Sequence, residues 1–229
     1  GVRYNHDKKD YAQAAPDFGA TPFAGSFSDD DWSGKVQLDY KPNDDWLLYF
    51  GISRGIKSGG FNIPLSPTFF DPTLYQYGGE TLLSYEVGLK AQVTERMRIN
   101  ASAFYYDYND YQAFNIDPSF NNVLFNATAE NYGAEIELTL NPVDGLDILL
   151  GLALLDTKIT DLPASISASG RETAIVSPEV AINGLVRYTW PAFNGNLAIQ
   201  GDFSWRDDQK YNLVTTPVIL EDAYGILNA

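Results

Sequence analysis

The chain has 229 residues, 45% of them hydrophobic, and its 30 acidic and 15 basic side chains give a net charge of −15. Nucleic-acid binding needs basic stripes, so this balance argues against it. There is no cysteine and one histidine. The sequence therefore has almost no residues for thiol chemistry, Cys/His metal sites or histidine-based catalysis. We expect neither an enzyme nor a bound cofactor.

Segments of alternating apolar and polar residues recur along the chain. In residues 84–93, for example, Tyr85 and Val87 fall on one face while Glu86 and Lys90 fall on the other. A period of two indicates a β-strand with one apolar and one polar face. About ten strands are predicted, at residues 1–6, 32–40, 46–53, 84–93, 97–106, 132–141, 146–155, 180–190, 197–206 and 223–229.

The connections between these strands are alternately short and long. Pro, Asn, Asp and Gly are frequent in the short ones, which are residues 41–45, 94–96, 141–145 and 191–196. The long ones are residues 8–31, 55–82, 107–129, 157–179 and 207–222. In an antiparallel up-and-down sheet, successive connections lie at opposite ends, so each class gathers at one end. This asymmetry predicts an all-β fold, an antiparallel up-and-down transmembrane β-barrel fragment of about ten strands.

Aromatic residues bracket the apolar faces, as Trp32 and Tyr40 do at the two ends of one strand. That spacing spans about 20 Å of the membrane normal once strand tilt is included. The mean hydropathy is −0.21 and no apolar run is long enough for a membrane helix. Trp and Tyr are also good strand formers, but scattered aromatic residues would not keep falling on the apolar face near its two ends, so we favour the membrane interpretation.

Strand parity predicts which side chains face lipid and which face the lumen of the barrel. The predicted lipid-facing residues are Val36, Leu38, Tyr85, Val87, Leu89, Ile136 and Leu138. The predicted lumen-facing residues are Lys35, Gln37, Glu86, Lys90, Glu135 and Glu137. Acidic residues gather in the long connections, among them Asp29 to Asp31, Asp207 and Asp208. They are either solvated loop tips or contacts for a divalent cation or a cationic substrate.

Several segments, in this order, resemble the barrels of TonB-dependent outer-membrane receptors. They are residues 54–62 (RGIKSGGFN), 80–81, 85–90 (YEVGLK), 104–108, 126–127, 129–137 (AENYGAEIE), 177–179 and 224–229. The chain opens and stops inside strands, so residues 1–229 are expected to be a partial barrel domain. On this resemblance, the plug domain, the first half of the barrel and the last strands are expected outside the sequence.

The resemblance implies a barrel of about 22 strands, plugged by an N-terminal domain, in the outer membrane of a Gram-negative bacterium. Such receptors import ferric siderophores, cobalamin, haem or carbohydrates with energy from the TonB complex. The implied partners are membrane lipid and lipopolysaccharide, the chain's own plug domain and missing strands, and TonB through an N-terminal part absent here. A passive porin-like barrel and a soluble all-β binding domain are the alternatives.

If the ligand is an iron chelate, four residues just beyond the apolar spans are candidates for its site. Arg54 and Lys57 would attract an anionic chelate, and Tyr108 and Tyr111 would supply stacking surface. Alternatively, the two cations pair with nearby acid or with lipopolysaccharide phosphates. The Gly-rich residues 58–62 open no helix and lack a following Lys-Ser/Thr, so we interpret them as a loop that needs permissive φ rather than as a phosphate-binding loop.

Overall fold

A computed structural model describes the chain except residues 15–21, 65–69, 164–165, 168–171 and 215–218. Ten antiparallel strands form one sheet in the order β1-β2-β3-β6-β7-β8-β9-β10-β11-β14. Their bounds are β1 Val2–Gln13, β2 Phe23–Asn43, β3 Trp46–Lys57, β6 Glu80–Thr94, β7 Met97–Ile116, β8 Asn122–Leu140, β9 Leu146–Thr160, β10 Val180–Ala192, β11 Gly195–Arg206 and β14 Tyr224–Asn228. The predicted all-β meander is confirmed.

Smaller elements lie within two of the long connections. The segment between β3 and β6 holds β4 (Gly60–Phe61), the 3-10 helix η3 (Pro72–Leu74) and β5 (Gln76–Tyr77), and β4 pairs with β5. The segment between β11 and β14 holds the paired strands β12 (Gln209–Lys210) and β13 (Leu220–Glu221). In the part of the chain that the structure describes, no helix is both long and apolar enough to cross a membrane.

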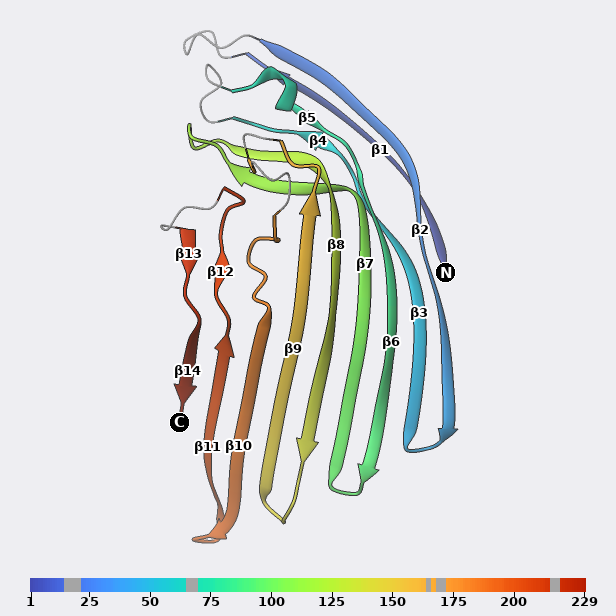
Figure 1. The fold of residues 1–229 in the computed structure, drawn as a ribbon. Coiled ribbons are helices and arrows are strands. Elements are labelled where there is room, and N and C mark those ends of the chain that lie inside the picture. Colours follow the sequence, from blue (N-terminus) through green and yellow to red (C-terminus); the bar gives the residue numbers. More distant parts are fainter. Residues whose placement is uncertain (15–21, 65–69, 164–165, 168–171, 215–218) are drawn as a thin grey trace.

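The short turns and the long connections lie at opposite ends of the curved sheet (Figure 1). We call these the turn end and the loop end. At the turn end, Gly145 adopts φ +83°, and a Cβ there would lie 2.1 Å from the carbonyl oxygen of Thr189. The amide of Thr189 donates to the carbonyl of Gly145 over 2.8 Å, so this turn is fixed to the neighbouring hairpin.

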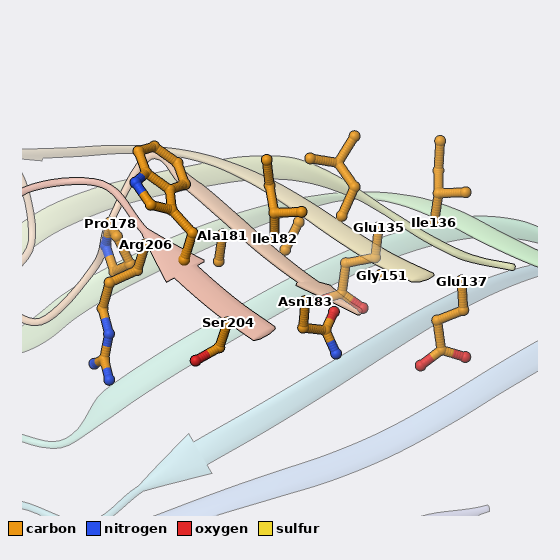
Figure 2. A pocket seen from close by; sticks show the side chains of 13 residues that line it. Glu135, Ile136, Glu137, Gly151, Pro178, Ala181, Ile182, Asn183, Ser204 and Arg206 are labelled. Carbon is orange, nitrogen blue, oxygen red and sulfur yellow. The ribbon is translucent and has the colours of Figure 1, made fainter. Parts of the chain in front are cut away.

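The two faces of the sheet differ as parity predicts. Figure 2 shows Glu137 and Asn183 pointing to one face and Ile136 and Ile182 to the other. We call these the polar face and the apolar face. The side chains of the apolar face are exposed, as with Val36 (77%), because no second layer covers them. A sheet with one continuous, uncovered apolar face matches the outside of a membrane barrel.

Two expected loops are largely strand, so those predictions are wrong. Residues 107–129 form a hairpin in which β7 and β8 pair up to Ile116 and Asn122. Its turn is held by Asp117 Oδ1, which accepts from the amides of Ser119 and Asn121 over 2.8 Å. Of residues 8–31, residues 8–13 and 23–31 likewise extend β1 and β2. In β7 the alternation is interrupted between Tyr108 and Tyr111, where the register shifts, whereas in β8 the buried residues Val123, Phe125, Ala127 and Ala129 do alternate with less buried ones.

Candidate ligand site at the loop end of the sheet

The long connections pack into a layer with its own hydrophobic core. The core gathers the buried residues Phe70, Tyr75, Ala113, Val123, Phe125, Ala127, Ala129, Ile159, Leu162 and Leu213. Figure 1 shows β7 and β8 bending over at this end of the sheet. We call this assembly the loop layer. In the described part of the chain, buried apolar side chains therefore pack against one another mainly at the loop end of the sheet.

Three side-chain amides join the β3–β6 connection to the β7–β8 hairpin. Asn62, which is 4% exposed, donates to the carbonyls of Leu74 (2.6 Å) and Leu124 (2.7 Å) and accepts from the amide of Leu124 (2.9 Å). Leu124 pairs with Phe114 of β7 on its other side, and β8 begins to pair with β9 only at Thr128. Asn62 therefore takes the place of a β-ladder between the two segments.

Gln112 and Asn126 make the corresponding contacts nearer the sheet. Gln112 Nε2 donates to the carbonyls of Ser58 (3.0 Å) and Gly78 (3.1 Å). Asn126 Oδ1 accepts from the amide of Gly78 (2.6 Å), and its Nδ2 donates to the carbonyl of Asp110 (2.7 Å). We call Asn62, Gln112 and Asn126 the amide clamp. Sequence reasoning named Asn62 and Asn126 within resembling motifs but missed their role, because an amide that satisfies a distant backbone leaves no local pattern.

The glycines of residues 58–62 serve close packing. Neither Gly59 nor Gly60 has a positive φ, so the expected need for permissive φ is wrong. A Cβ on Gly59 would lie 2.5 Å from the carbonyl oxygen of Tyr77 and 2.6 Å from the ring of Phe27. The Lys9 ammonium donates to the carbonyl of Gly59 over 2.6 Å, which ties β1 to the same point. The absence of a side chain at Gly59 therefore allows close contact with Phe27 of β2 and Tyr77 of β5.

Tyr108 and Tyr111 lie together because β7 contains a bulge. Residues three apart on a regular strand point to opposite faces, but here Tyr108 pairs with Ala129 and Tyr111 with Ala127, so β7 has one extra residue. Asp110 in the bulge has φ 55°. The two rings meet edge to face with centroids 5.3 Å apart. Both tyrosines also pack against the core of the loop layer.

Glu80 lies beside the two tyrosines. Its carboxylate accepts from the amide of Gln112 over 2.7 Å. Burial raises the pKa of Tyr111, and the nearby Glu80 charge adds to this effect. The phenol is therefore neutral at physiological pH and presents a ring and a hydroxyl rather than a phenolate.

Lys57 lies on the same face of the sheet as Glu80, next to the two tyrosines, whereas Arg54 does not. Lys57 is exposed and pairs across strands with Glu80. Arg54 lies three residues earlier on β3, so its side chain is on the opposite, apolar face. Its Nη1 contacts Asp31 Oδ1 at 2.6 Å, and its guanidinium lies 4.8 Å from the centre of the Trp32 ring. Of the four predicted residues, the structure thus brings Lys57 to the two tyrosines through its partner Glu80, and it places Arg54 on the apolar face against Asp31 and Trp32.

In the described ranges, no group of three or more His, Cys, Asp or Glu side chains could hold a metal ion. The polar face of the sheet has a cavity of about 420 Å³ between β8 and β11 (Figure 2). The residues that line it include the small residues Gly151 and Ala153 and the charged residues Glu135 and Arg206. It lies on the sheet and does not include the tyrosine pair.

The model of the family "TonB dependent receptor-like, beta-barrel" matches residues 1–229, which is the whole chain. The chain belongs to the TonB-dependent receptors. Receptor barrels of this family are Gram-negative outer-membrane proteins, so the predicted family and location are both confirmed. The family is one of transporters and receptors, not of enzymes.

The chain spans between a fifth and about a third of the length of the curated relatives and solved receptors described here. Pesticin receptors from Yersinia enterocolitica and Yersinia pestis are 30% identical over 141 residues, 60% of this chain and 20% of each relative. The ferric yersiniabactin uptake receptor FyuA from Yersinia pestis has a TM-score of 0.76 at 20% identity, over 99% of this chain and 33% of that one. The copper transporter OprC has a TM-score of 0.72 at 15% identity, over 99% and 36%. These structural similarities show the TonB-dependent receptor fold.

Proposed function

We propose that this chain is part of a receptor that imports an iron chelate, such as a ferric siderophore, with energy delivered by the TonB complex. The family match supports the transport class. The names of the relatives support iron, since FyuA is described as a ferric yersiniabactin uptake receptor. The observation that carries the ligand class is the group formed by Lys57, Tyr108 and Tyr111 in the loop layer.

These three side chains suit a planar or aromatic chelate with negative charge. The Lys57 ammonium attracts the charge, and Tyr108 and Tyr111 offer ring edges, faces and neutral hydroxyls. The amide clamp holds the segment that follows Lys57 against the strand that carries the tyrosines. A site that is ordered before binding loses less conformational entropy on binding. Arg54 is the fourth candidate from the sequence, and its side chain lies on the opposite face, in contact with Asp31 and Trp32.

The proposal includes the rest of the protein as partners. The sheet has two open edges, β1 and β14. Unpaired strand edges are not stable in lipid, so we propose that further strands of the same protein close the barrel and that a plug domain fills its lumen. TonB would act through that plug, and lipid with lipopolysaccharide would surround the apolar face. A passive porin is the weaker alternative, because the family match covers every residue.

The test uses the full-length receptor and its cognate ferric chelate. We expect the triple substitution Lys57→Ala, Tyr108→Ala and Tyr111→Ala to weaken chelate binding at least about 10-fold, or about 1.4 kcal/mol. The amount of folded barrel, measured by heat-shift electrophoresis, should stay the same. Binding of the chelate at wild-type affinity would remove these residues from the site.

Arg54→Ala is measured separately, because Arg54 already contacts Asp31 and Trp32. Reduced chelate uptake with unchanged folding would assign Arg54 to the ligand. Uptake at the wild-type level would mean that Arg54 does not act on the ligand. Its role would then be to hold β3 to β2 through Asp31 and Trp32.

A further inference from the structure

The turn between β10 and β11 differs from the three other turns at the turn end of the sheet (Figure 1). The tips of the other three carry charged side chains, at Asp44 and Asp45, at Glu95 and Arg96, and at Asp144. Residues 191–195 have the sequence PAFNG, with no charged side chain. Of these four turns, all of which lie in the described ranges, this one therefore has the only uncharged tip, and Phe193 is its largest side chain.

Phe193 is held in a backbone conformation that phenylalanine seldom adopts. Ala192 pairs with Gly195, so Phe193 and Asn194 form a two-residue hairpin loop. Both have a positive φ, of 48° and 62°, as in a type I′ turn. Asn, Asp and Gly are the residues that such a turn favours, and a bulky side chain raises its energy. The turn itself therefore gives no reason for a phenylalanine at this position.

The Phe193 ring is not covered by any residue that the structure describes. Phe193 is 94% exposed, the highest value among the exposed large hydrophobic residues of the described part. Leaving a phenyl ring in water is unfavourable, because its apolar surface stays hydrated. Backbone and side chain thus both favour another residue here, unless the ring has an apolar partner in the assembled protein.

The turn continues the apolar face that we assign to lipid. On that face the rings of Tyr188 and Trp190 stack with their centroids 5.6 Å apart, and Leu197, the cross-strand partner of Trp190, is half-exposed. Trp and Tyr gather at the boundary between acyl chains and headgroups. Phe193 follows Trp190 by three residues, or about 8 Å along the membrane normal at the usual rise and tilt. The headgroup layer is about 5–8 Å deep, so the ring can reach lipid.

We propose that Phe193 is a membrane anchor, whose ring inserts among the phospholipids of the periplasmic leaflet and fixes the depth of the β10–β11 hairpin. Insertion removes the ring from water, which offsets the unfavourable backbone conformation. The tip has no charged side chain that would have to be dehydrated on insertion. The proposal rests on the apolar face lying in lipid and on the turn end being periplasmic, and it does not depend on the chelate.

The first experiment measures depth in phospholipid vesicles that contain the full-length receptor with one introduced thiol as its only cysteine. A nitroxide spin label on Phe193→Cys is compared with the same label on Asp144→Cys, whose side chain is 98% exposed. We expect collisions with a water-soluble nickel chelate to be at least about 5-fold less frequent for position 193. Because both positions are open in the protein itself, that difference would come from lipid. Equal collision rates would overturn the proposal.

The second experiment needs no label and depends on the sign of an effect. Asn adopts a positive φ readily, so Phe193→Asn should stabilise the turn if the ring has no partner. If the ring lies in lipid, we expect Phe193→Asn to lower the folding equilibrium constant in vesicles about 5-fold or more, measured by urea unfolding. Phe193→Trp is the control, because it keeps both the φ and an anchoring ring, and it should fold like the wild type. A constant equal to or above the wild-type value for Phe193→Asn would overturn the proposal.

Discussion

Gly133 illustrates how a single residue fixes the packing of neighbouring strands. It lies in the segment that resembles the receptor family, opposite Phe104 on β7 and Leu155 on β9. A Cβ at this position would lie 2.3 Å from the carbonyl oxygen of Leu154 and 2.6 Å from the ring of Phe104. Since one of these atoms belongs to the backbone, no side-chain rotation could relieve the contact.

We therefore expect Gly133→Ala to destabilise the barrel by about 1–3 kcal/mol, the usual effect of overpacking. The measurement is urea unfolding of the full-length receptor in detergent or lipid. Gly51→Ala is the matched control, because the nearest atoms to a Cβ there are 3.9 Å away. An equal change in unfolding free energy for both variants would mean that lost backbone flexibility, not space, determines the outcome.

The apolar face gives a second prediction at this scale. Leu89 lies opposite Leu48 and Ala101 on the face that we assign to lipid. Leu89→Arg should reduce the free energy of unfolding in lipid by about 2–4 kcal/mol if the residue lies near the midplane. Gln37→Arg, on the polar face, should have little effect. Similar losses for both variants would show that the two faces are not distinguished by lipid.

At the scale of elements, the strands within the bilayer were predictable and their extensions were not. Alternation located ten strands because one face of each is apolar, as with residues 84–93. The same rule failed in β7 beyond Tyr108, where the bulge at Asp110 changes the phase of the alternation, whereas residues 122–129 keep a period of two in their burial. Of the candidate site, sequence indicated the tyrosines but not that a bulge brings them to one face.

The amide clamp is the element-scale feature that sequence could not reveal, and it can be tested directly. Replacing Gln112 and Asn126 with Ala leaves the carbonyl of Gly78 without either of its donors. Each lost bond to a buried group is worth about 1–3 kcal/mol. We expect the amides of residues 76–79 to exchange with deuterium about 10-fold faster or more, while the amides of β9 keep their rates. The exposed Asn109→Ala is the control.

At the scale of the whole molecule, the ten-stranded sheet divides its roles between its two ends. The turn end consists of tight hairpins, whereas the loop end carries the core, the amide clamp and the proposed chelate site. This division suits a receptor whose ligands arrive from one side of the membrane. In barrels of the outer membrane the short turns are periplasmic, so the loop layer should face the medium.

The absence of cysteine from the sequence allows this orientation to be tested with single introduced thiols. Phe120, at the tip of the β7–β8 hairpin, is 78% exposed, and the Asp144 side chain, in the β8–β9 turn, is 98% exposed. We expect a membrane-impermeant maleimide to label Phe120→Cys in intact cells and Asp144→Cys only after the outer membrane is permeabilised. Because both thiols are freely accessible in the protein, a difference in labelling can come only from the membrane. The reverse pattern would place the loop layer in the periplasm, where the tyrosine pair could not meet a ligand from outside.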